Sequence, residues 1–160
     1  MKEQSKKEQV DYWIKTAWLS ISRMYNAFAA DYETTYASGL ALLYIDVEKG
    51  TPATKIAPQM GMESRSLTRI LKTLEERGMI IREADATDKR KVIVRLTPAG
   101  IQYRDYSKRT VLGFNEFLRS EIAPEKLSCF FEVMQQIQAS TEAYASQAIR
   151  EKAQTQENFN

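Results

Sequence analysis

The sequence of 160 residues predicts a mainly α-helical fold with a small β-hairpin wing. Three observations support this prediction. Apolar residues recur at helical spacing towards both ends of the chain, two runs rich in β-branched residues lie near its middle, and a glycine separates two short helical segments just before those runs. Helix, tight turn, helix and hairpin in this order predict a winged helix-turn-helix flanked by long dimerisation helices.

The first helix is expected from about Ser5 to Ala30, and the second from Gly39 to Lys49 with Gly50 as its C-terminal cap. In the first helix, apolar residues alternate between spacings of four and three, which is the heptad pattern of a helix packed along another long helix. These residues are Val10, Ile14, Ala17, Ile21, Met24 and Phe28.

A short third helix is expected with Thr51 as its N-cap and Pro52 at its first position. Pro58 would remove one of its internal hydrogen bonds, and Gly61 would supply the turn after it. The next helix is expected over 64–77, because its apolar residues fall on one helical face. They are Leu67, Ile70, Leu71 and Leu74.

The runs Ile80–Ala84 and Lys91–Leu96 are rich in β-branched residues and predict the two strands of a hairpin. Thr97 is expected to cap a helix that continues to about Ser120. A last helix is expected from Pro124 to about Ile149, with a second heptad pattern. Its apolar seam consists of Leu127, Phe130, Met134, Ile137, Thr141, Tyr144 and Ala148.

The chain therefore divides into four expected segments. Residues 1–35 would form an N-terminal dimerisation helix, 36–98 the winged lobe, 99–150 the C-terminal dimerisation helices and 151–160 a polar tail. A two-fold dimer would bury both heptad seams and double the length of a recognised site. The alternative is that the two seams pack on each other within one chain.

The composition excludes several classes of protein. There is no histidine, which removes the commonest general base and metal ligand, and one cysteine cannot complete a tetrahedral zinc site. No metal or cofactor is expected. The sequence has neither a glycine-rich phosphate loop nor a nucleophile-elbow motif, so we do not expect an enzyme. We expect no signal peptide and no membrane span, and therefore a cytoplasmic protein. Cys129 is expected to be a small buried apolar residue.

Charge is distributed unevenly along the chain. Residues 55–109 carry 13 Lys and Arg against 7 Asp and Glu, whereas the rest carries 10 against 14. A basic region attracts polyanions over roughly 8–10 Å at physiological salt. Because this region coincides with the winged segment, double-stranded DNA is the expected partner.

Two groups of residues are expected to contact DNA. A major groove accepts one helix, and arginine can pair with the O6 and N7 atoms of guanine. The outward residues of the 64–77 helix are Ser64, Arg65, Ser66, Thr68, Arg69 and Lys72. The wing tip offers Lys89, Arg90 and Lys91 to the minor groove, with Asp88 placed to orient the arginine two residues on. The alternative is a solvated charged surface.

These residues resemble the MarR family of bacterial regulators. The resemblance lies in Ile56–Gly61, Ser66–Leu71, Leu74–Ile80, Asp88-Lys89-Arg90 and Leu96-Thr97-Pro98-Ala99-Gly100. A wing Asp-x-Arg followed by Leu-Thr-x-x-Gly is fairly specific. The middle third of the chain matches strongly, and the helical arms match in order and length.

The resemblance implies a fold of six helices and two strands, a triangular homodimer, and binding to a near-palindromic operator, usually as a repressor. It also implies that Asp88 orients Arg90 towards the minor groove. Many members are released by small aromatic or phenolic ligands, and others respond to cysteine oxidation. Two residues depart from the family pattern. Pro58 is unusual in the supporting helix, and Cys129 lies in the last helix rather than near the start of the first.

A ligand site is expected from aromatic side chains between the first two helices, because small-molecule sites are concave and largely aromatic. The candidates are Trp13, Trp18, Tyr36 and Tyr44. The alternative is that these aromatic residues belong to the core. A further alternative for the whole chain is a winged-helix module that binds protein without DNA, since the fold alone does not determine function.

Overall fold

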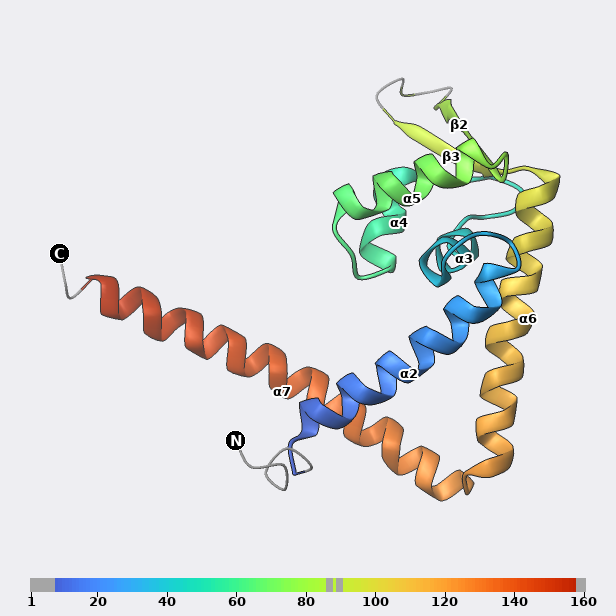
Figure 1. The fold of residues 1–160 in the computed structure, drawn as a ribbon. Helices are drawn as coiled ribbons and strands as arrows, with labels where there is room; N and C mark the ends of the chain where they lie inside the picture. Colours follow the sequence, from blue (N-terminus) through green and yellow to red (C-terminus); the bar gives the residue numbers. More distant parts are fainter. Residues whose placement is uncertain (1–7, 86–87, 89–90, 158–160) are drawn as a thin grey trace. The chain divides into compact units, whose positions relative to one another are not determined.

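The computed structural model describes residues 8–85, 88 and 91–157. The helices and strands follow one another as α2 (Val10–Ala30), α3 (Tyr36–Leu43), β1 (Thr51–Pro52), α4 (Ala53–Gln59), α5 (Ser64–Glu76), β2 (Ile80–Ala84), β3 (Val92–Leu96), α6 (Pro98–Glu121) and α7 (Pro124–Glu157) (Figure 1). The predicted fold class, mainly helical with a small β wing, is confirmed.

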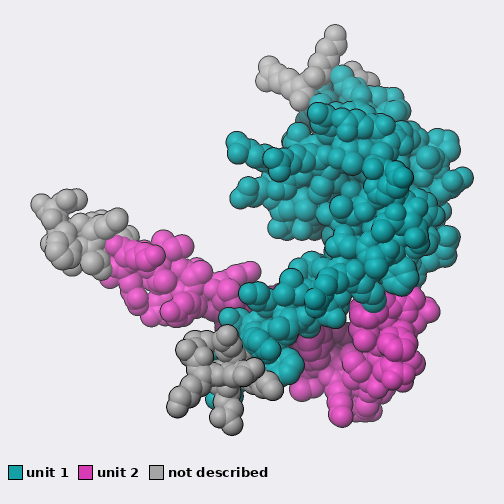
Figure 2. Space-filling view, in the orientation of Figure 1, with its two compact units in different colours: residues 1–112 teal, residues 113–160 magenta. Residues whose placement is uncertain are grey.

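The chain forms two compact units, residues 1–112 and 113–160, which Figure 2 colours separately. The first unit holds α2 to α5, the sheet and the first part of α6. The second holds the end of α6 and all of α7. The core cluster lies in the first unit, and every helix and strand from α3 to α6 contributes to it except β1.

The predicted apolar face of α5 is confirmed. Leu67, Leu71 and Leu74 are buried and Ile70 is half-buried. They pack with Ile56 and other buried residues of the core cluster. Burial of an amphipathic face against the core stabilises such a helix more than intrinsic propensity does. The remaining face of α5 is consequently left to solvent.

The sheet is antiparallel with strand order β1-β3-β2, so the wing hairpin gains a short third strand. The prediction that Thr51 caps a helix is wrong, because Thr51 pairs with Val94 in β1. Its hydroxyl donates to the carbonyl of Tyr44 (3.2 Å) and accepts from the amide of Asp46 (2.9 Å). Pro52 instead precedes α4 as its N-cap residue, and Pro58 lies within that helix.

Helix α3 is shorter than predicted and begins earlier, at Tyr36 instead of Gly39. The hydroxyl of Thr35 accepts a hydrogen bond from the Ser38 amide (3.2 Å) and caps its start. After Leu43 the chain turns, because the carboxylate of Asp46 accepts the amides of Lys49 (2.7 Å) and Glu48 (3.0 Å). These two bonds lower the pKa of Asp46 and offer the backbone an alternative to further helix.

Helix α6 is anchored at its start by the Leu-Thr-Pro-Ala-Gly segment. Thr97 caps the helix as predicted, since its hydroxyl accepts from the Gly100 amide (3.1 Å), and it also donates to the Gly78 carbonyl (2.6 Å). A Cβ atom on Gly100 would lie 1.9 Å from the carbonyl oxygen of Met79. The glycine is therefore required by a close backbone approach.

The second unit is dominated by α7, which runs eight residues past the predicted end at Ile149. Cys129 is exposed, so the prediction that it is buried is wrong for this chain. Large apolar side chains of this helix are also exposed, namely Phe130, Phe131, Val133, Tyr144 and Ile149. In the part of the chain that the structure describes, no helix is both long and apolar enough to cross a membrane.

Candidate nucleic-acid interface

One face of α5 forms a polar and basic surface. Every residue of this helix that the sequence predicted to contact DNA is exposed. We define the outer face of α5 by these residues, which are Ser64, Arg65, Ser66, Thr68, Arg69 and Lys72. The buried stripe of leucines holds the outer face away from the core, so these side chains face solvent.

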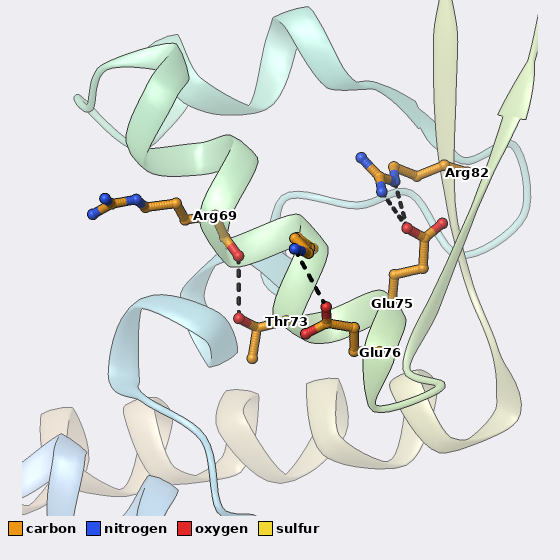
Figure 3. Close-up of polar contacts among 6 residues, drawn as sticks. Arg69, Thr73, Glu75, Glu76 and Arg82 are labelled. Carbon is orange, nitrogen blue, oxygen red and sulfur yellow. Dashed lines mark hydrogen bonds and ion pairs between the residues drawn. The ribbon is translucent and has the colours of Figure 1, made fainter.

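The positive charge of the outer face comes mainly from Arg65 and Arg69, which lie one helical turn apart. Within the described residues, neither guanidinium forms an ion pair with a carboxylate, and Figure 3 shows Arg69 extending away from Glu75 and Glu76. Lys72 differs, because its Nζ atom lies 3.7 Å from Glu76 Oε1. That exposed pair offsets part of its charge.

The start of α5 suits an anion. Gly61, with a φ of +62°, makes the turn that separates α4 from α5. Glu63 precedes α5 in an extended conformation, and its side chain forms no cap hydrogen bond. The first backbone amides of a helix carry partial positive charge and bind phosphate readily when no side chain caps them.

The base of the wing is organised by two aspartates. The Asp88 amide donates to Asp85 Oδ1 (2.9 Å), and the Lys91 amide donates to the Asp88 carbonyl (2.8 Å). Lys91 is exposed, and its Nζ atom lies 3.4 Å from Asp88 Oδ2. Lys89 and Arg90 lie outside the described residues, so the orientation of Arg90 by Asp88 stays a prediction.

A buttress between α5 and the wing was not found from the sequence. The Arg82 guanidinium, on β2, donates two hydrogen bonds to Glu75 Oε2 on α5, and its Nε atom lies 2.9 Å from that oxygen (Figure 3). The guanidinium lowers the pKa of Glu75, and the pairing raises that of Arg82. The pair ties the first wing strand to the end of α5. Residues 75 and 82 belong to different elements, and no local pattern in the sequence connects them.

The first unit also contains a pocket of about 310 Å³ between α2, α3 and α6. Its lining is mostly aromatic and aliphatic, with two aliphatic hydroxyls: Tyr25, Phe28, Ala29, Tyr36, Gly39, Leu40, Leu43, Tyr103, Tyr106, Ser107, Thr110 and Val111. Tyrosine phenols are already neutral at pH 7, and burial raises the pKa of Tyr25, Tyr36 and Tyr103 further above that pH.

Of the four residues predicted to bind a ligand, Tyr36 lines this pocket. Trp18 contacts Tyr36 edge-on with ring centroids 6.0 Å apart, but it is not itself a lining residue. Trp13 packs against Tyr12 and is largely exposed, and Tyr44 is also exposed. The sequence reasoning missed the tyrosines of α6, because nothing local places residues 103 and 106 beside α2 and α3.

The fold and this basic surface define a winged helix-turn-helix protein. The family model of the MarR family matches residues 35–92, which span the lobe from the end of the α2–α3 connection to the start of β3. Residues 35–92 thus carry a MarR-family domain, in the segment where the motifs resemble that family. Members of this family are transcription regulators and are not enzymes.

One curated relative is similar in sequence, and two solved structures are similar in fold. The chain is 33% identical over 97 residues to the HTH-type transcriptional regulator TtmR of Methylorubrum extorquens. The aligned residues make up 61% of this chain and half of TtmR. A solved complex of S. aureus MepR with DNA has a TM-score of 0.76 at 19% identity, covering 82% of this chain and 97% of MepR. The repressor CouR bound to a 23-mer DNA duplex has a TM-score of 0.73 at 24% identity, covering 86% and 97%.

Proposed function

We propose that this chain is a homodimeric, sequence-specific DNA-binding transcription regulator that represses its target until a small aromatic ligand releases it. The observation that carries the proposal is the outer face of α5, where Arg65 and Arg69 are exposed and unpaired with carboxylates among the described residues. Such a regulator acts on chromosomal DNA in the bacterial cytoplasm.

The outer face fits a major groove by its chemistry. Arginine binds guanine O6 and N7 with two hydrogen bonds, and serine and threonine hydroxyls contact bases or phosphates. The wing would lie at the adjacent minor groove with Lys89, Arg90 and Lys91, and Asp88 would orient Arg90. MepR and CouR, which share the fold, have been solved in complexes with DNA.

A homodimer would use the helical arms, residues 1–35 and 99–150. In the single chain α2 exposes Val10, Trp13 and Phe28, and α7 exposes Phe130 and Tyr144. Apolar area of this kind is stabilised when a second copy covers it. Two-fold symmetry then presents two α5 helices to two half-sites of a near-palindromic operator.

Ligand release would begin in the aromatic pocket. CouR has also been solved with p-coumaroyl-CoA. In this chain Tyr32 packs against Tyr103 of the pocket with ring centroids 4.5 Å apart. The next residue, Glu33, pairs with Arg77 at the end of α5 (3.1 Å). A ligand that shifts the pocket tyrosines would therefore move the end of the DNA-contacting helix.

The test is DNA binding by the full chain, with operator fragments selected from genomic DNA. We expect affinity to fall steeply with salt, because phosphate contacts release counterions. Arg65→Ala and Arg69→Ala should each cost about 1–3 kcal/mol on the selected site and weaken its discrimination from altered sites. Arg119→Ala, an exposed arginine of the second unit, serves as the matched control and should bind as the wild type does.

Two results would contradict the proposal. One is that no duplex binds even at low salt, which would favour a winged helix that binds protein. The other is that Arg65→Ala, Arg69→Ala and Arg119→Ala all bind the selected site with wild-type affinity and selectivity, which would remove the outer face of α5 from the contact surface.

A further inference from the structure

We propose that the aromatic pocket of the first unit selects an uncharged aromatic compound and rejects the corresponding carboxylate. The proposal rests on the proposed function, in which a ligand of this pocket releases the regulator from DNA. It specifies the chemical class of that ligand.

The first step is the absence of charge in the lining. All twelve lining residues lie in the described part of the chain, and none of them is Lys, Arg, Asp or Glu. Nearby cations of α6, namely Arg104, Lys108 and Arg109, do not line the pocket, and Arg104 pairs with Asp105 (3.6 Å). The sequence has no histidine to supply a positive charge instead.

The second step is the state of the hydroxyl groups. Tyr25, Tyr36 and Tyr103 present phenols that are neutral at pH 7, and burial raises their pKa further. The Tyr106 hydroxyl donates to the Phe28 carbonyl (3.4 Å), and that of Thr110 donates to the Tyr106 carbonyl (3.0 Å). Two of the hydroxyl protons that could solvate a carboxylate are thus already engaged.

The free energy of removing a ligand from water favours an uncharged ligand in this pocket. An ionised carboxylate that leaves water for a site without a cation loses far more hydration than neutral hydroxyls return, whereas a neutral amide, ester or phenol loses much less than the ion does. Relatively few hydrogen bonds are needed to orient such a neutral ligand. The pocket therefore discriminates by charge before it discriminates by shape.

The aromatic rings of the lining indicate the shape of the ligand. Tyr25 and Tyr36, which both line the pocket, stack with centroids 4.8 Å apart and an interplanar angle of 9°, so their rings are held nearly parallel. A flat aromatic ring can pack against these parallel ring faces, so the ligand class that we test is a single ring with a short substituent.

The experiment compares three probes that share a phenol ring and differ in charge at neutral pH. The uncharged probes are 4-hydroxybenzamide and methyl 4-hydroxybenzoate, and the anion is 4-hydroxybenzoate. Titration calorimetry on the full chain should show at least one neutral probe binding more than about tenfold tighter than the anion. Equal or tighter binding of the anion, or no binding of either neutral probe, overturns the proposal.

A variant tests the cause of the selectivity. Thr110→Arg introduces a cation into the half-buried lining and should reverse the preference towards 4-hydroxybenzoate, while Thr110→Leu, with no charge, should keep the wild-type preference. Circular dichroism establishes that both variants are folded. If the folded Thr110→Arg variant still rejects the anion, missing charge is not the cause and the proposal is wrong.

The wild-type preparation used in the probe titrations is also assayed for DNA binding without a probe. Loss of all DNA binding would contradict the proposed function and leave the probe affinities as a separate result. Normal DNA binding with no preference for the neutral probes would contradict the selectivity alone.

Discussion

At the residue scale, Thr97 and Gly100 show why a motif typical of the family has its particular residues. Thr97 Oγ1 both donates to the Gly78 carbonyl and accepts from the Gly100 amide. The Thr97 amide donates to the Met79 carbonyl (3.1 Å). Gly100 lies so close to that carbonyl that a Cβ atom would overlap it. The motif thus joins the start of α6 to the chain between α5 and β2.

The first prediction concerns stability. Gly100→Ala should lower the free energy of unfolding by about 3 kcal/mol, because the added methyl group must displace backbone. Thr97→Ala should cost about 1 kcal/mol through loss of the cap, and Thr97→Ser should retain most of it. Urea unfolding followed by circular dichroism measures all three.

The control for this prediction lies on the same helix. Gly113 has no heavy atom within 4 Å of an added Cβ. Gly113→Ala should therefore stabilise the chain by roughly 0.5–1 kcal/mol, as expected for glycine in a helix interior. Equal effects of Gly100→Ala and Gly113→Ala would show that the close approach at Met79 does not matter.

At the element scale, the buttress between Glu75 and Arg82 joins the two parts of the surface proposed to contact DNA. Arg82 belongs to β2, and Glu75 occupies the last turn of α5. A second wing pair, Arg95 with Glu83 (3.1 Å), links β3 to β2. Exposed pairs contribute little to stability, so we expect the buttress to act on the position of the wing.

The second prediction separates the effect of the position of the wing from the effect of the negative charge on α5. Glu75→Gln and Glu76→Gln each remove one negative charge from α5, which by itself favours DNA. Glu76 pairs with exposed Lys72, whereas Glu75 holds Arg82. We expect Glu75→Gln to bind the operator several-fold more weakly than Glu76→Gln in a fluorescence anisotropy titration. Equal affinities of the two variants would show that the buttress has no part in DNA binding.

The same scale shows which features the sequence could predict. Helix α5 and its leucine stripe follow from a local apolar period, and its ends are within one residue of the prediction. Helix α3 was misplaced, because the Asp46 turn competes with the helix and a periodicity argument does not include that competition. Strand β1 was missed because two residues carry no period, and only pairing with β3 defines them.

The candidate sites also differ in how far a local sequence pattern could predict them. The outer face of α5 could be predicted because the residues that face outwards are those left over from one helical stripe. The pocket could not, because its walls come from helices separated by some sixty residues of sequence. Of the candidates Trp13, Trp18, Tyr36 and Tyr44, only Tyr36, at the start of α3, lines the pocket, and its role in ligand binding stays a prediction.

At the scale of the whole molecule, charge and apolar exposure are divided along the chain. The basic residues concentrate in 55–109, and the segments on either side are acidic overall. The large exposed apolar side chains of α7 lie outside that basic region. The surface proposed to bind DNA and the surface proposed to bind a second copy therefore consist of different residues and can be altered separately.

The last prediction uses that independence. Phe130 belongs to the predicted α7 seam and is 53% exposed in the single chain. Phe130→Glu places a charge where a partner would cover it, so it should convert the dimer to a monomer at micromolar concentration, measured by light scattering. Because one α5 helix then contacts one half-site, operator affinity should fall although no DNA-contacting residue has changed.

The matched control is Ala139→Glu, which adds the same charge to α7 at an exposed position outside the heptad seam. It should leave both the dimer and operator binding intact, because water still solvates the new carboxylate. If Phe130→Glu remains dimeric and binds as tightly as Ala139→Glu does, this part of α7 is not the interface. The heptad seam of α7 would then need a different explanation, such as packing of the two arms within one chain.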